Sequence, residues 1–234
     1  MIKQLLIGIF LSIPVVCYSQ EFRVGVGIVN EQMLSNSEIT TQDGLIISEE
    51  NKFPTSIESF YVGYAYSFSP KFKANIGLQN TYNNIALFVQ VPLPISTKIR
   101  TVRNNNFEFP IEVSYVLFKK EKFNFKLRGG LVPVWSVSRS LQMTEVPEGP
   151  DWSQEVVDAL NAAETIPKSF YMNYQYGLAL SYGRLEFSLF QSANLSRSIS
   201  NGYTLNGTTY PFDRRISSTR IGLYYSIWLK KEKE

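Results

Sequence analysis

The dominant feature of the chain is an alternation of apolar and polar residues with period two. Apolar side chains recur at every second position over eight stretches, and this is the pattern of β-strands with one apolar face. The predicted strands lie within residues 22–28, 60–68, 71–91, 107–117, 123–127, 170–182, 185–189 and 220–229. The fold class is therefore expected to be all-β, with about eight strands.

The longest predicted strand, 71–91, changes its apolar phase. Apolar residues occupy even positions from Phe72 to Leu78 and odd positions from Ile85 to Val91. A β-bulge inserts one residue and shifts the alternation by one position. The change of phase predicts a bulge near residues 82–84.

The connections between the strands alternate in length. Short turns at 69–71, 119–122 and 183–184 alternate with long polar segments at 31–55, 92–105, 138–168 and 196–213. This layout is typical of an antiparallel up-and-down transmembrane β-barrel with short periplasmic turns and long extracellular loops. A soluble β-sandwich or a lipocalin would share the alternation. The residues opposite the apolar face are mostly Gly, Ala, Ser, Asn and Gln, which suit a narrow lumen, and aromatic residues gather beside the short turns, so the membrane barrel is favoured.

The N-terminus has the features of a secretory signal peptide. Lys3 precedes an apolar run from Leu5 to Val16, which is too short to span a bilayer, and Ser19 offers a small residue for cleavage. We expect residues 1–19 to be a signal peptide and 20–234 to be a single barrel domain in the cell outer membrane. Lipidation of Cys17 is the alternative, but Val16 is not the small residue that a lipobox places before its cysteine.

The composition narrows the chemistry. The chain has no histidine and one cysteine, which removes Ser-His-Asp hydrolases and zinc sites built on His or several Cys. The net charge of +3 is too small for a nucleic-acid binder. We expect no catalytic residue, cofactor or metal, hence no enzyme, and no nucleic-acid partner; the expected partners are outer-membrane lipid and other envelope proteins.

Charged residues also occupy the face that the alternation assigns to the lumen. Since an eight-stranded barrel is only wide enough for side chains, these charges are expected to pair into an internal plug. The alternative is a positively biased path for anions. The residues are Arg23, Lys73, Glu108, Glu112, Lys126, Arg128, Arg184, Glu186 and Arg220.

One long segment contains a helical pattern. Residues 151–163 begin with a capping aspartate and place Trp152, Val156 and Leu160 at helical spacing, which predicts one short amphipathic helix in an extracellular loop. It is either a lid or partner-docking surface, or a packed cap over the barrel mouth. Acidic residues gather in 31–55 and 138–168 and basic residues in 92–105 and 196–213, so we expect ion pairs between loops; binding of divalent ions or a basic partner is the alternative.

The segments 106–113 and 125–134 carry a family resemblance. Asn-Phe-Glu-Phe-Pro-Ile-Glu-Val is followed by a charged turn and by Phe-Lys-Leu-Arg-Gly-Gly-Leu-Val-Pro-Val. This resembles the PorT-like outer-membrane β-barrel domain family of the Bacteroidota. The resemblance implies a signal peptide followed by one eight-stranded barrel, from about residue 21 to 229. The expected function is a non-enzymatic structural or binding component, an accessory of a larger envelope or secretion complex; the alternative is a porin-like protein that conducts small solutes or anions.

Overall fold

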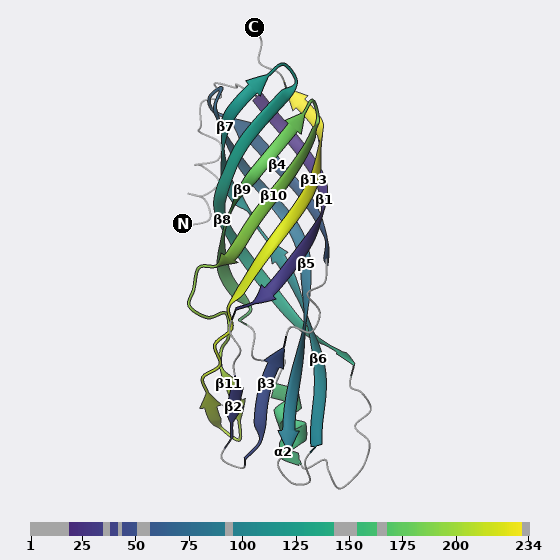
Figure 1. Cartoon of the computed structure of the whole chain (residues 1–234), viewed down its shortest axis with the longest axis vertical. Helices are drawn as coiled ribbons and strands as arrows, with labels where there is room; N and C mark the ends of the chain where they lie inside the picture. The colour runs from purple at the N-terminus through teal and green to yellow at the C-terminus, as the bar shows by residue number, and fades with distance from the viewer. Residues whose placement is uncertain are drawn as a thin grey trace, which may run out of the picture.

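The computed structural model describes residues 19–34, 38–41, 44–50, 57–91, 96–142, 154–162 and 168–230. These residues form a closed antiparallel β-barrel of eight strands with one short helix (Figure 1). The predicted fold class is confirmed. Predictions that concern the signal peptide and Trp152 lie outside the described residues. Within the described chain, every helix is too short or too polar to cross a membrane.

The barrel strands follow one another around the wall in chain order. Each pairs antiparallel with the next, and β1 closes the barrel against β13 in a register that runs from Gln20↔Lys230 to Met33↔Ile216. Closure leaves the barrel wall without an unpaired edge strand. The strands are β1 (Ser19–Met33), β4 (Ile57–Ser67), β5 (Phe72–Val91), β6 (Ser96–Glu108) continued by β7 (Ile111–Lys120), β8 (Phe123–Gln142), β9 (Phe170–Tyr182), β10 (Leu185–Asn194) and β13 (Ile216–Lys230).

β6 and β7 are two parts of one barrel strand. They are separated at Phe109 and Pro110, where proline lacks the amide hydrogen that a sheet ladder needs. Hydrogen bonds continue across the break, because Gly77 N donates to Pro110 O at 3.0 Å and Phe109 N donates to Pro133 O at 2.9 Å. The count of eight strands treats this pair as one.

The outside of the barrel is an apolar band. Alternate residues of each strand expose large apolar side chains there, including Val26, Phe60, Leu78, Val113, Leu127, Leu178, Phe187 and Ile221. Aromatic pairs border the band at the short-turn end (Phe72–Tyr115 and Phe123–Tyr182) and at the other end (Phe107–Trp135). An apolar exterior between aromatic girdles is the surface of a barrel that spans a membrane.

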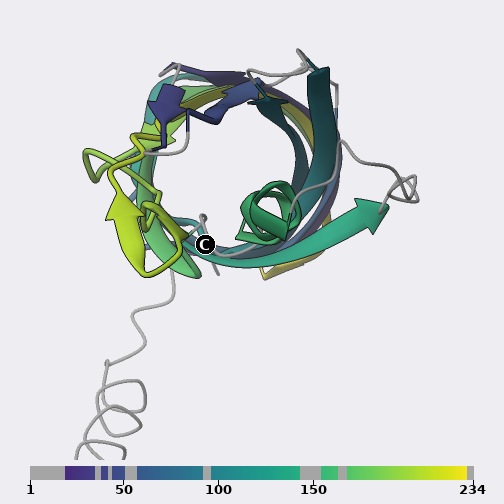
Figure 2. The ribbon, with the colours of Figure 1, turned by 90° about the horizontal axis from the view of Figure 1, so that it is seen from below.

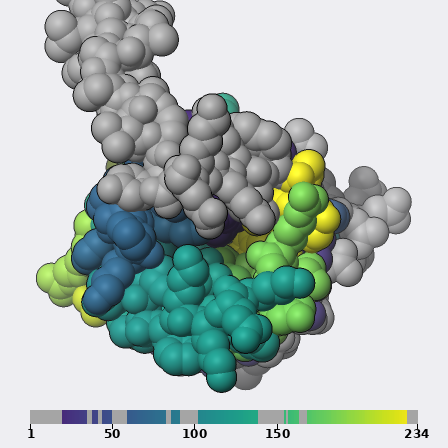
Figure 3. Space-filling model, turned by 90° about the horizontal axis from the view of Figure 1, so that it is seen from above, coloured from purple at the N-terminus to yellow at the C-terminus, as the bar shows by residue number. Residues whose placement is uncertain are grey.

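The two ends of the barrel differ. The turns β4–β5, β7–β8 and β9–β10 form the rim of one end (Figure 3). At the opposite end, β5 and β6 extend beyond the barrel. There β3 (Ile46–Glu50) pairs with β5, and β2 (Glu38–Thr40) pairs with β3. With helix α2 (Gln154–Ala162) and the hairpin of β11 (Tyr203–Leu205) and β12 (Thr208–Tyr210), these outer parts form a module that we call the cap (Figure 1).

The cap has a hydrophobic core of its own. Viewed along the barrel from the cap end, α2 lies within the outline of the ring (Figure 2). The core joins the helix, the hairpin and the outer strands, so the cap is a folded unit over the barrel mouth. Its buried residues are Ile39, Leu45, Ile47, Leu87, Val89, Val102, Val156, Ala159, Leu160, Tyr203, Leu205 and Phe212.

The bulge predicted in β5 is wrong. The register between β5 and β6 runs without a shift from Gln79↔Glu108 to Val91↔Ser96. The apolar phase changes because the surroundings change: Ile76 and Leu78 point outward to the apolar band, whereas Leu87 and Val89 point inward into the cap core. The segments 92–105 and 138–168 are also not loops throughout, since β6 and the end of β8 continue the sheet into them.

Candidate functional site

The barrel lumen contains a network of buried ion pairs. Its centre is Glu186 of β10, whose carboxylate accepts hydrogen bonds from Lys126 Nζ at 2.6 Å, Arg128 Nη1 at 2.7 Å and Arg23 Nη1 at 3.2 Å. Ser181 Oγ adds a fourth donor at 2.9 Å. The four charged side chains are at most 5% exposed, so their attraction is little weakened by solvent.

Two further carboxylates extend this network. Glu112 pairs with Arg128 and accepts a hydrogen bond from Gln175 Nε2 at 2.5 Å. Glu21 of β1 joins Arg23 to Lys73 of β5. Glu21 was not among the predicted lumen residues, because the predicted strand began at residue 22. The alternation that places Arg23 inside also places Glu21, two residues earlier, inside.

A second group of polar residues lies nearer the cap. Arg220 Nη2 donates to Glu108 at 2.8 Å, and Thr81 Oγ1 donates to the same carboxylate at 2.6 Å. Gln79 is a third donor to Glu108. Arg184 is the predicted lumen residue that the structure places elsewhere: it is exposed in the β9–β10 turn, because β10 begins only at Leu185.

Aromatic rings fill the lumen beside the charges. Tyr61 and Tyr224 meet edge to face with their ring centroids 5.0 Å apart. The neighbouring positions Gly63 and Gly222 have no side chain, and a Cβ atom added there would collide with these rings. The Arg128 guanidinium lies 4.8 Å from the centre of the Phe190 ring, so the network and the rings pack as one core.

A small chamber lies beside the Glu108 group. A polar chamber bordered by Thr81, Asn106, Glu108, Tyr171 and Asn173 has a volume of about 10 Å³. This is about the space that one water molecule needs. The ion pairs and the aromatic rings thus occupy the described part of the lumen beside this chamber.

The predicted helix is part of the cap. Val156 and Leu160 are 1% and 6% exposed, because both pack into the cap core. Neither side chain is available on the surface, so these two residues serve packing in this structure. Trp152, the third predicted docking residue, precedes the described helix.

A buried ion pair fastens the cap together. Arg214, from the segment before β13, pairs with Glu49 of β3 through two hydrogen bonds, one of them from Nε to Oε2 at 3.0 Å. Both side chains are 2% exposed. The pair joins an acidic segment to a basic one, as predicted for ion pairs between the loops.

The β11–β12 hairpin presents the exposed polar surface of the cap. Asn206 and Gly207 both have positive φ angles, which a two-residue hairpin turn of this kind requires. Tyr203 and Leu205 point into the core, whereas Thr204, Thr208 and Thr209 are exposed. The hairpin thus holds its polar face outward on a fixed base.

Similarity to known proteins is found among solved structures of low sequence identity. No protein-family model and no curated protein matches the chain. Among solved structures, it is similar to Ail, the attachment invasion locus protein of Yersinia pestis (9% identity, 90% of this chain and 99% of that chain, TM-score 0.42). It is also similar to LpxR from Salmonella typhimurium (7%, 88% and 100%, TM-score 0.32) and to the translocator domain of the autotransporter NalP from Neisseria meningitidis (11%, 96% and 93%, TM-score 0.30).

One expectation is corrected. The inference that this chain is no enzyme, drawn from its missing histidines, does not stand. The missing imidazole removes only the designs that need one. The resemblance to the PorT-like family stays a prediction.

Proposed function

We propose that this protein is an outer-membrane β-barrel that acts as a structural or binding component of the envelope, with recognition carried by its cap. The apolar band between two aromatic girdles supports the placement in a membrane. The long segments of such barrels lie outside the cell, so the cap is extracellular. An accessory role in a larger envelope or secretion complex, as the PorT-like resemblance implies, fits this arrangement.

The observation that carries the proposal is the cap itself. Long loops without a core would have no fixed shape. The cap, in contrast, buries twelve residues in a common core, and the Glu49–Arg214 pair joins β3 to the segment before β13. A fixed surface lowers the conformational entropy that binding must overcome. The ion pairs in the lumen make the barrel a rigid support for the cap.

The ion-paired lumen supports this proposal over conduction of solutes or anions. The arginines that would line an anion path are engaged with carboxylates: Arg128 with Glu112 and Glu186, and Arg220 with Glu108. Opening a path would require these buried pairs to separate, so that each charge would lose its partner.

Site-specific photo-crosslinking in cells tests the recognition role. A photoreactive residue at Thr209, on the exposed face of the hairpin, is expected to give a discrete crosslinked species with a second envelope protein. The same residue at Glu121, in the exposed β7–β8 turn at the opposite end, is the matched control. Equal crosslinking at both ends, or none at Thr209 and its neighbour Thr204, would contradict recognition by the cap.

A further inference from the structure

Three basic residues meet on one turn at the cap end of the barrel wall. Lys168 Nζ donates to the Ser198 carbonyl at 3.0 Å, and Arg215 Nε donates to the Arg197 carbonyl at 2.9 Å. The Arg197 side chain is 83% exposed and lies 3.9 Å from Asp213. We call Lys168, Arg197 and Arg215 the rim cluster. Among the described side chains named here, three are basic and one is acidic, which is a composition that suits an anionic ligand.

Exposed apolar side chains adjoin the rim cluster. Leu34 is 60% exposed, and its amide donates to the Arg215 carbonyl at 2.8 Å. Leu195, which is 61% exposed, lies on the same turn as Arg197. Leucines beside cations suit the boundary between lipid headgroups and acyl chains, where apolar and charged groups of a ligand meet.

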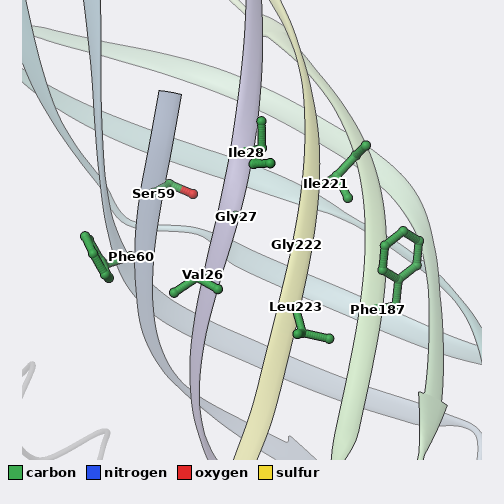
Figure 4. A pocket seen from close by; sticks show the side chains of 9 residues that line it. All are labelled: Val26, Gly27, Ile28, Ser59, Phe60, Phe187, Ile221, Gly222 and Leu223. Carbon is green, nitrogen blue, oxygen red and sulfur yellow. The ribbon is translucent and has the colours of Figure 1, made fainter. Parts of the chain in front are cut away.

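The same wall of the barrel carries an apolar groove. It has a volume of about 440 Å³ and crosses β4, β1, β13 and β10. Figure 4 shows Phe60 and Phe187 at its two sides, with aliphatic side chains of β1 and β13 between them. Gly27 and Gly222 face each other across the two strands, so the floor is partly backbone.

The groove lies deeper in the membrane than the rim cluster, at a distance that the acyl chain of a lipid can reach. Ile221, which lines the groove, follows Arg215 by six residues in β13. Six residues of strand span about 20 Å, and a tilt of about 40° converts this to a depth of about 15 Å. That is about half the thickness of the hydrocarbon layer.

We propose that this wall binds one phosphate-bearing lipid of the surrounding leaflet, with a phosphate on the rim cluster and an acyl chain in the groove. Charge selects the phosphate, and the adjoining apolar surface selects a lipid over a soluble phosphate compound. The inference rests on the membrane placement proposed above but not on recognition by the cap.

Native mass spectrometry of the full-length protein in detergent tests the proposal. The probes are a diphosphorylated lipid A, the same lipid without phosphates, phosphatidylcholine and inorganic phosphate. We expect one diphosphorylated lipid to be retained per protein. Replacing Lys168, Arg197 and Arg215 together by Gln should weaken this binding about 100-fold, since each basic residue at a membrane surface contributes about 1 kcal/mol.

A charge-matched control separates the site from general attraction. Replacing Lys119, Lys122 and Arg184 by Gln removes three exposed positive charges from the opposite rim and should leave binding unchanged. Val26→Trp should fill the groove and weaken retention of the lipid, whereas Leu178→Trp, on the outer face of β9, should not.

Several results would overturn the proposal. Equal binding of the dephosphorylated lipid would remove the role of phosphate, and binding of inorganic phosphate as tight as that of the lipid would remove the role of the groove. An equal loss in the control triple variant would show attraction without a site. Insertion of each variant into phosphatidylcholine vesicles is measured separately, because failure of the wild type to insert contradicts the membrane placement itself.

Discussion

Replacement of Glu186 by Gln tests whether the lumen charges hold the barrel together. This carboxylate pairs with Arg23, Lys126 and Arg128, and all four side chains are nearly fully buried. Gln keeps the shape of the side chain and removes its charge. Three cations then share a confined space from which their central counter-charge has been removed.

The size of the effect follows from the contacts. Lys126 and Arg128 both touch the Glu186 carboxylate, at 2.6 and 2.7 Å. At an effective dielectric constant of about 20, two cations about 7 Å apart repel each other by about 2–3 kcal/mol. Breaking a buried ion pair costs about 3–5 kcal/mol in other proteins. We therefore expect Glu186→Gln to lower the free energy of unfolding by about 3–5 kcal/mol.

Urea unfolding of the protein in phospholipid vesicles, followed by tryptophan fluorescence, measures this change. Glu121→Gln, in the exposed β7–β8 turn, is the control with the same change of charge and should shift the free energy by less than about 0.5 kcal/mol. Adding Lys126→Met to Glu186→Gln should recover part of the loss, because one uncompensated cation is removed. Equal stability of the Glu186 and Glu121 variants would refute the electrostatic reasoning.

Three further predictions concern the outer wall, the cap and the lumen. Leu178→Arg, on the lipid face of β9, should destabilise the barrel by about 2–4 kcal/mol if the position lies near the bilayer midplane. Asn30→Arg, beyond the apolar band, should cost about 0–1 kcal/mol in the same urea assay. The reverse order would show that the outer face assigned to β9 is wrong. Arg214→Met should make the cap sensitive to protease while the barrel stays folded on an unheated gel, and Glu49→Gln in addition should restore resistance; an unchanged cap in the single variant would contradict the role of the pair. Single-channel recording of the wild type in a planar bilayer should show no stable conductance, and anion-selective openings that disappear in Arg128→Ala would favour transport.

The period-two alternation was enough to predict the barrel. A strand of a membrane barrel faces lipid on one side and a packed lumen on the other, so the alternation of its sequence shows which side chains point outward. In β10, the exposed Phe187 and Leu189 alternate with the buried Glu186 and Ser188. The same rule placed eight of the nine predicted charges in the lumen and failed only for Arg184, at the end of a strand, where alternation no longer fixes a direction.

Only the tertiary structure decided which charges pair and what the long segments do. Partners such as Arg220 and Glu108 are 112 residues apart, and their contact depends on the stagger of the strands around the barrel, which no single strand encodes. A packed cap was one of the two expectations for the helix, but the extension of β5 and β6 into it was missed for a related reason. The apolar residues of β5 lie on its outer, lipid-facing side up to Leu78 and on its inner side from Leu87, where they pack into the cap core. From the sequence alone, this change of side looked like a bulge.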